Sequence, residues 1–413
     1  MNVSKRKAFT VVAAAASVAL AAGTAMPANA ASALKVGAIL PLTGGLAFLG
    51  DPMVAGFWAA VNEINAAGGV LGNKVVVTGI KNEHDGSNLA ISTQSAKEQV
   101  AAGADVILGA ASSGRSYNII KDITGAGIVQ ISPSNTDIGL STYADGGYYF
   151  RTAPSDLLQG RVLGNKVLAD GKRNVAIIYQ QSSYGTGLMK TAKDALTKGG
   201  AKVKTYAFTE GETNFTSTAN SIKAQNADAI VVVSYDEFLK IAPALKAKGF
   251  SGKQLYMCDG NMADYSAASF KAWLKGAQGT NAGASPTKSF ASKLSGAFEA
   301  KMDKELTLSI YGAEAYDAII VAALAAEEAK STAAADIKQH MVSVTKGGTK
   351  VTTFKAAVAA IKAGKDIDYD GQSGPIDFDA NGNPGKAYMG VYVYDAKGAN
   401  SLKKNYLTAV PAK

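Results

Sequence analysis

Two short polar clusters in the first half of the chain each follow an apolar run of residues. They are Ala110–Gly114, with the sequence AASSG, and Pro133–Thr136, with the sequence PSNT. Small hydroxyl residues and backbone N–H groups at a helix start can bind an anion, and the natural guest of such a site is a carboxylate. Serine and threonine are also the ordinary N-cap residues of helices, which accounts for either cluster alone. Two such clusters in adjacent loops favour a carboxylate site.

The second half of the chain places aromatic residues and one acid after comparable apolar runs. These residues are Tyr184, Tyr235 and Asp259. Tyrosine rings pack against apolar ligands while their hydroxyls keep hydrogen bonds, and a carboxylate pairs with an ammonium group. Taken singly, they fit surface tyrosines and a helix-capping aspartate equally well. Taken together with the carboxylate clusters, they predict an amino-acid site between two lobes.

Sequence signals for catalysis, cofactors and metals are weak. The chain carries no G-x-S-x-G, G-x-x-x-x-G-K-[ST] or G-x-G-x-x-G motif. Its one cysteine, Cys258, excludes an internal disulfide and a cysteine-cluster metal site. Its two histidines, His84 and His340, leave little for zinc binding or histidine-based catalysis. We therefore expect a protein that is not an enzyme and has no cofactor or metal.

An alternation of apolar, β-permissive runs with helical stretches positions these residues. Such alternation predicts an α/β fold with parallel strands joined by crossover helices, and ligands bind beyond the carboxyl ends of such strands. The pattern restarts after about Pro154, which predicts a second α/β unit. The expected strands are 34–40, 75–80, 105–109, 128–132, 175–179, 203–208, 229–233 and 254–257, and the expected helices are 52–66, 87–101, 117–124, 157–168, 187–198, 218–224 and 238–248.

The last part of the chain, after about Ser285, has a mainly helical pattern. It ends with an expected hairpin, in which strands at 375–378 and 388–395 flank the turn-rich segment Asp379–Asn383. The expected helices of this part are 289–304, 312–330 and 355–362.

The N-terminus has the pattern of a cleavable secretory signal. Three basic residues at 5–7 precede an apolar run at 8–22, and Ala28-Asn29-Ala30 is a small-x-small site. The alternative is an uncleaved anchor, but the run is shorter than the ~20 residues of a membrane span. No cysteine follows the cleavage site for a lipid anchor. We predict a signal peptide at 1–30 and a mature protein in the periplasm that is not anchored to the membrane.

Composition and charge agree with a soluble binding protein. The 413 residues are 47% hydrophobic and 18% charged, as in globular proteins, and this length predicts two domains. The formal net charge is +9, of which three charges belong to the signal, so the mature chain carries +6. Its lysines are scattered through helical stretches, which is typical of a solvated face rather than a nucleic-acid surface. We expect no nucleic-acid partner.

The segment Val36–Gly45, with the sequence VGAILPLTGG, resembles the opening strand and loop of the leucine/isoleucine/valine-binding protein family. These are type I periplasmic solute-binding proteins of branched-chain amino-acid ABC transporters. The resemblance implies two Rossmann-like lobes with parallel sheets, joined by a three-segment hinge. The implied lobes are 31–153 plus 286–373 and 154–285 plus 374–413. Further matching segments follow in order at 64–74, 131–133, 150–156, 184–187, 311–318 and 374–379.

The resemblance also assigns roles to site residues by their position. It implies that the ligand α-carboxylate is held by one lobe, that the second lobe supplies aromatic walls, and that an acid binds the ammonium. The carboxylate residues are Ser113, Asn135 and Thr136, the walls are Tyr184 and Tyr235, and the acid is Asp259.

Three departures from the family pattern bear on the ligand. Many members have a disulfide where this chain has Ser87 and Ser112, so both partners are missing together. Asp259 stands where the family commonly has glutamate, and Leu49 stands where it often has tyrosine. The last two differences leave the branched-chain specificity open.

The expected function is therefore extracytoplasmic capture of a solute. A monomer would close its two lobes around a branched-chain or other neutral amino acid and deliver it to an ABC permease. The alternatives are a binding protein for another small carboxylate, aromatic acid or amide, and a ligand sensor on the same fold. A secreted hydrolase is a third class, which the missing nucleophile motifs disfavour.

Overall fold

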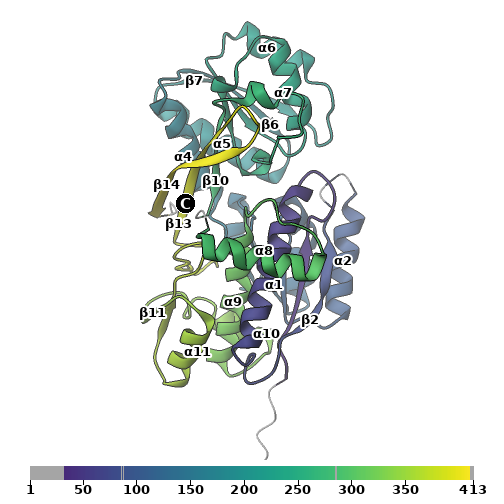
Figure 1. Ribbon diagram of the computed structural model, residues 1–413, viewed down its shortest axis with the longest axis vertical. Helices are drawn as coiled ribbons and strands as arrows, with labels where there is room; N and C mark the ends of the chain where they lie inside the picture. The colour runs from purple at the N-terminus through teal and green to yellow at the C-terminus, as the bar shows by residue number, and fades with distance from the viewer. Residues whose placement is uncertain (1–31, 85, 87, 284–285, 410–413) are drawn as a thin grey trace, which may run out of the picture. The chain divides into compact units, whose positions relative to one another are not determined.

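The computed structural model describes residues 32–84, 86, 88–283 and 286–409. These residues form a five-stranded sheet, a seven-stranded sheet and a two-stranded ladder, with helices around the two larger sheets (Figure 1). We call the five-stranded sheet with its helices the first lobe, and the seven-stranded sheet with its helices the second lobe. The predicted signal peptide at 1–30 lies outside the described residues.

The sheet of the first lobe is parallel throughout, with the strand order β2-β1-β3-β4-β5. The central strands are buried almost along their whole length, as expected for a parallel sheet covered on both faces. The strands are β1 (Lys35–Leu40), β2 (Val76–Asn82), β3 (Val106–Gly109), β4 (Val129–Ser132) and β5 (Tyr149–Arg151), and the helices between them are α1 (Gly50–Ala66), α2 (Leu89–Ala101) and α3 (Ser113–Gly125).

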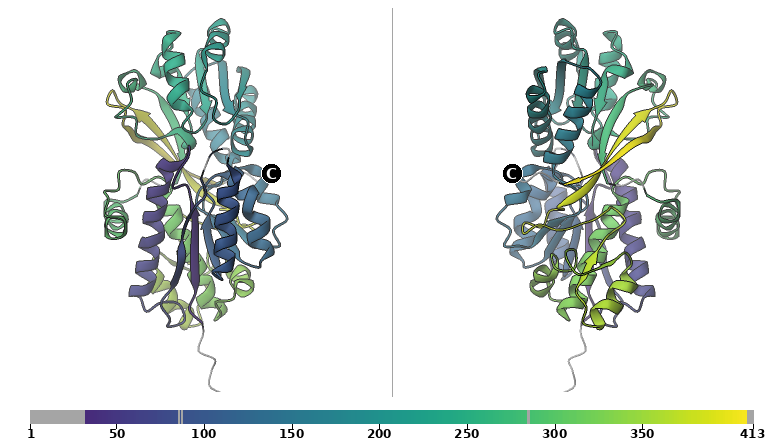
Figure 2. Two further views of the ribbon diagram at one scale, coloured as in Figure 1. Left: turned by 90° about the vertical axis from the view of Figure 1, so that its right-hand side faces the viewer. Right: turned by 90° about the vertical axis from the view of Figure 1, so that its left-hand side faces the viewer.

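Helices from the last third of the chain complete the first lobe. The long helix α9 (Gly312–Ala329) packs along α1, and the two lie side by side in both views (Figures 1 and 2). Glycines allow this close approach, because a Cβ atom at Gly56 would lie 2.2 Å from the carbonyl oxygen of Gly312. The remaining elements are α8 (Lys288–Met302), α10 (Ala334–His340), α11 (Phe354–Lys362) and the ladder of β11 (Thr349–Val351) with β12 (Ile367–Tyr369).

The sheet of the second lobe has the order β14-β13-β10-β9-β8-β6-β7. Strands β6 to β10 are parallel, whereas β13 runs antiparallel to both β10 and β14. Its strands are β6 (Asn174–Gln180), β7 (Lys202–Phe208), β8 (Ala229–Val233), β9 (Leu255–Met257), β10 (Gln278–Ala282), β13 (Lys386–Tyr394) and β14 (Asn400–Ala409), and its helices are α4 (Asp156–Ala169), α5 (Ser183–Lys198), α6 (Thr216–Ala224) and α7 (Phe238–Ala247).

The prediction of the C-terminal hairpin is wrong in the strand that pairs with β13 and in the turn that joins the two strands. The observed hairpin is β13 with β14, and its turn is Asp395–Ala399, in which Asp395 Oδ1 accepts from the amides of Lys397 and Ala399. The segment at 375–378 makes only single bridges. Asp379 accepts from Asn381 and Asn383 in a loop of its own, so the Asn-Gly signal marks a loop that joins no two strands.

The other expected elements exist within a few residues of their predicted ends. The predictions missed β14, which has ten residues, and the shorter elements β5, β10, the β11–β12 ladder and α10. Within the described part of the chain, every helix is too short or too polar to cross a membrane. The lobe boundaries expected from the sequence stay a prediction.

Candidate functional site

The candidate site is a small space between the carboxyl ends of the two sets of parallel strands. The first lobe contributes residues that follow β1, β3 and β4, and the second lobe contributes residues that follow β6, β8 and β9. This is the position that open α/β sheets offer to ligands. The space is lined by Leu46, Leu49, Ala111, Ser113, Ser134, Tyr184, Tyr235, Asp259, Gly260 and Tyr311.

The structure brings four of the predicted residues together in this lining. They are Ser113 from the first lobe and Tyr184, Tyr235 and Asp259 from the second. The rings of Tyr184 and Tyr235 stack with centroids 5.2 Å apart and planes 13° from parallel. All four residues are buried.

The structure places Asn135 and Thr136 outside this lining. The Asn135 side chain is part of the framework, since Nδ2 donates to the Ala111 carbonyl and Oδ1 accepts from the Tyr149 hydroxyl. The Thr136 hydroxyl lies near Asp156 but makes no hydrogen bond of normal geometry within the described residues. Their neighbour Ser134 lines the space instead.

The predicted anion site at Ala110–Gly114 needs a correction, because a resident carboxylate occupies part of it. Glu83 is fully buried and accepts from the backbone amides of Ala111 and Ser112, at 2.5 Å and 3.0 Å. Those two N–H groups are therefore not open to a ligand. The amides of Ser113 and Gly114 begin helix α3 and have no acceptor within that helix, so they are the donors left for a guest.

Glu83 also ties the loop after β2 to the loop after β3. The family resemblance implies a disulfide between these two loops, where this chain has Ser87 and Ser112. The Glu83 contacts with Ala111 and Ser112 join the loops without a covalent bond. Ser87 lies outside the described residues.

Asp259 is the central charged group of the site. Its Oδ1 accepts from Gln159 Nε2 and the Tyr184 hydroxyl, both at 2.9 Å, and its Oδ2 accepts from the Tyr311 hydroxyl at 2.6 Å. Burial raises the pKa of the Asp259 carboxyl, and these three donors only partly offset the rise. An arriving cation would stabilise the ionised form further.

Asp156, which the sequence reasoning missed, is a second buried acid next to Asp259. It begins α4, is fully buried, and neither carboxyl oxygen has a hydrogen bond of normal geometry in the described chain. Burial raises its pKa well above the ordinary value, and the charges of Asp259 and Asp137 raise it further. Arg151 lowers this pKa by a smaller amount. Burial therefore favours the neutral form of both acids, and a positively charged group beside Asp259 would favour its ionised form.

Tyr311 and Leu46 were also missed, for different reasons. Tyr311 lies on the segment before α9, where it has a positive φ of 60° that only its surroundings can hold. No short motif marks such a residue, since its place depends on the chain returning from the second lobe. Leu46 lies in the loop after β1, one helical turn before Leu49. The departure of Leu49 from the family pattern had already indicated that this loop lines the site.

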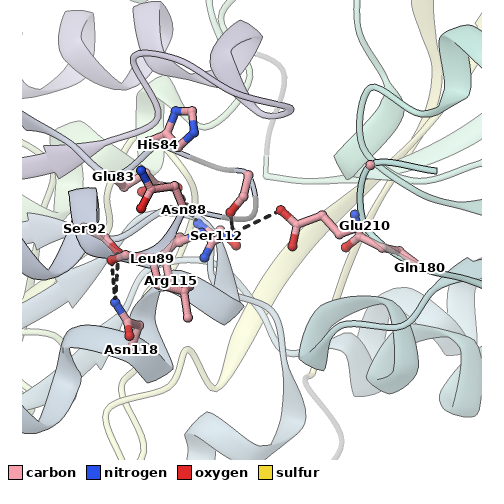
Figure 3. Close-up of polar contacts among 12 residues, drawn as sticks. Glu83, His84, Asn88, Leu89, Ser92, Ser112, Arg115, Asn118, Gln180 and Glu210 are labelled. Atoms are coloured by element: carbon pink, nitrogen blue, oxygen red, sulfur yellow. Dashed lines mark hydrogen bonds and ion pairs between the residues drawn. The ribbon is translucent and has the colours of Figure 1, made fainter. Parts of the chain in front are cut away.

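An ion pair connects the two lobes near the site. Arg115 Nη2 of α3 lies 3.0 Å from Glu210 Oε1, which follows β7 (Figure 3). The Arg115 side chain is 5% exposed and also donates to the Gly86 carbonyl, so the pair is anchored firmly on the side of the first lobe. Such a contact forms only when the lobes are close.

Over the described ranges, no group of three or more His, Cys, Asp or Glu side chains is arranged to hold a metal ion. Cys258 is buried, and its sulfur lies 3.0 Å from the Tyr184 hydroxyl and 3.3 Å from the Val232 carbonyl oxygen. His84 lies in the loop after β2 and contacts Thr43.

Comparison with known proteins gives one family and several relatives. A family model described as periplasmic binding protein matches residues 33–400. The Leu/Ile/Val-binding protein homolog 3 of Brucella melitensis is 30% identical over 221 residues, which are 53% of this chain and 59% of that protein. The chain thus spans about three-fifths of the length of this curated relative.

Two solved structures share the fold. A leucine-binding protein from Thermotoga maritima matches with a TM-score of 0.74 at 20% identity, over 90% of this chain and 98% of that one. A branched-chain amino acid transporter substrate-binding protein from Streptococcus pneumoniae, in complex with isoleucine, matches with a TM-score of 0.71 at 23% identity, over 92% and 100%.

The Glu83 contacts predict a loss of stability on truncation. Glu83→Ala leaves two buried amides without an acceptor, so we expect the free energy of unfolding to fall by about 2–4 kcal/mol in urea denaturation. Glu83→Gln keeps one acceptor oxygen, so its free energy of unfolding should lie between those of the wild type and Glu83→Ala. The matched control is Glu98→Ala on the exposed side of α2, which should unfold like the wild type. Equal midpoints for Glu83→Ala and the wild type would contradict the role of Glu83.

Proposed function

Because the chain belongs to the periplasmic binding protein family, we propose that it captures an amino acid with a neutral, aliphatic side chain in the space between its lobes. It is a binding protein rather than an enzyme, and it acts as a monomer. The observation that carries this proposal is a buried acid, Asp259, in the lining of the space, with a second buried acid, Asp156, close to it.

The acids account for the ammonium group of the ligand. A buried carboxyl of raised pKa gains most from a cation, because the cation offsets the unfavourable burial of the ionised form. Asp259 is held in place by three side-chain donors, which fixes the direction in which it presents its remaining lone pairs.

The opposite wall accounts for the carboxylate. Ser113 lines the space and begins α3, where N–H groups and the helix dipole favour a negative charge. The groups for the two charges belong to different lobes, so a zwitterion bridges the lobes when it binds. That bridging favours the closed arrangement, in which Arg115 and Glu210 also meet.

The remaining lining accounts for the side chain. Leu46 and Leu49 are apolar, and Tyr184 and Tyr235 present their stacked rings. Such a lining rejects a charged side chain, because an unpaired buried charge is costly. It also agrees with the names of the relatives, which describe leucine, isoleucine and valine as their ligands.

We further propose delivery to an ABC permease from the periplasm. The family description and the names of the relatives support this place in transport. The signal peptide at 1–30 directs export and is removed in the mature protein. N-terminal sequencing of the exported protein should begin at Ala31, and a protein that starts at Met1 or keeps residues of the apolar run would contradict cleavage after Ala30.

The role of Asp259 is tested by calorimetric titration with L-isoleucine. Asp259→Ala removes the acid that pairs with the ammonium, so we expect the affinity to fall by more than tenfold, or ~1.4 kcal/mol or more. Asp264→Asn is the matched control, since it removes an exposed acid five residues further along and should bind like the wild type.

Two results would count against the proposal. Unchanged affinity in Asp259→Ala would reject the ammonium role of Asp259. A wild-type protein that binds no neutral amino acid, in a thermal-shift screen across amino acids and small carboxylates, would reject the ligand class, since a bound ligand must raise the melting temperature.

A further inference from the structure

A second cavity, of about 320 Å³, lies between the segment before α9 and the C-terminal hairpin. We call it the Glu314 cavity. Its lining includes the segment 307–311, the end of β10 at Asn281, and residues of β13 and β14 around Tyr392 and 400–402. Among the residues that the structure describes, it shares only Tyr311 with the lining of the amino-acid space. The proposed function does not use it.

Two polar side chains in this lining lack partners. Glu314 is 3% exposed and Asn281 is 6% exposed. Within the part of the chain that the structure describes, neither Glu314 Oε1 nor Asn281 Oδ1 has a hydrogen-bond partner. Asn281 Oδ1 is an acceptor, and Glu314 Oε1 is an acceptor when the carboxyl is ionised. A buried acceptor without a donor costs free energy, so two in one cavity call for a guest that supplies donors.

The surroundings of Glu314 determine which donor suits it. Burial raises the pKa of the Glu314 carboxyl to about 8, and the nearby charge of Asp317 contributes to the rise. The Tyr311 hydroxyl is also close enough for Glu314 to raise its pKa, and a phenol cannot balance a negative charge. A cation inside the cavity would let Glu314 ionise.

We propose that the Glu314 cavity is a second binding site, for a small aliphatic molecule that carries a protonated amine. The ammonium group donates to Glu314 and to Asn281, which supplies the two missing partners. The apolar part of the guest lies against Leu308, Ile310 and Leu402, which share the lining. The cavity has room for such a chain, whereas a bare monovalent ion would leave most of it to water.

The test is calorimetric titration of the mature protein with n-butylammonium, in the presence of saturating L-isoleucine to fill the first site. We expect saturable binding with release of close to one proton at pH 7, measured in buffers of different ionisation enthalpy, because Glu314 gives up its proton. Butyrate and 1-butanol, which have the same chain without an ammonium group, should bind at least tenfold more weakly.

The variants localise the effect. Glu314→Gln should weaken n-butylammonium binding at least tenfold and abolish proton release, and Asn281→Ala should weaken it several-fold. Glu305→Gln, an exposed acid in the segment that leads to the cavity, is the matched control and should leave binding unchanged. Circular dichroism melts establish whether each variant is folded. If Glu314→Gln is not folded, the Asn281→Ala variant still tests the proposal.

Three outcomes would overturn the proposal. The first is equal amine binding in the wild type, Glu314→Gln and Asn281→Ala. The second is the absence of saturable binding, in which case the cavity holds water only. The third is a loss of amine binding in Asp259→Asn, titrated without isoleucine, which would place the amine in the first space. Failure of the amino-acid proposal is a separate result. It would appear as a lack of isoleucine binding, whether or not n-butylammonium binds.

Discussion

The structure depends on a carboxylate that is buried at the meeting point of several chain segments. Asp259 follows β9 of the second lobe, and its partners are Gln159 of α4, Tyr184 of α5 and Tyr311 of the segment that enters α9. Tyr311 reaches Asp259 only when the first lobe, to which α9 belongs, is close. The acid is therefore both the chemical centre of the site and a group whose surroundings depend on closure. Its raised pKa expresses the cost of burying a negative charge without a cation.

The rest of the fold holds the two walls around that acid in register. Parallel strands in both lobes end at the site, so the loops that follow them meet there. Glu83 fixes the loop after β3 from within the first lobe, and Arg115 with Glu210 joins the lobes at the side. Two walls that each keep their own shape are what hinged closure requires.

The sequence predicted the alternating elements and the loops at the site, since both follow from local patterns. Ser113, Tyr184, Tyr235 and Asp259 come directly after strands, and the rule that ligands bind at strand ends selects them. Asn135 has the same signal, but its side chain holds Ala111 and Tyr149 in the framework, which depends on a contact that no local pattern encodes. Glu83, Asp156 and Tyr311 act across long sequence distances for the same reason. The hairpin prediction failed because the Asn-Gly pair occupies a loop, while Asp395 builds the turn.

The central claim is that the buried acids require a positively charged group on the ligand. The most direct measurement compares, by calorimetry on the wild-type protein, L-isoleucine with 3-methylpentanoate, which has the same carbon skeleton and carboxylate but no amine. The account predicts that the deaminated acid binds at least a hundredfold more weakly, because Asp259 then faces an apolar group. Equal affinity for the two compounds would contradict it.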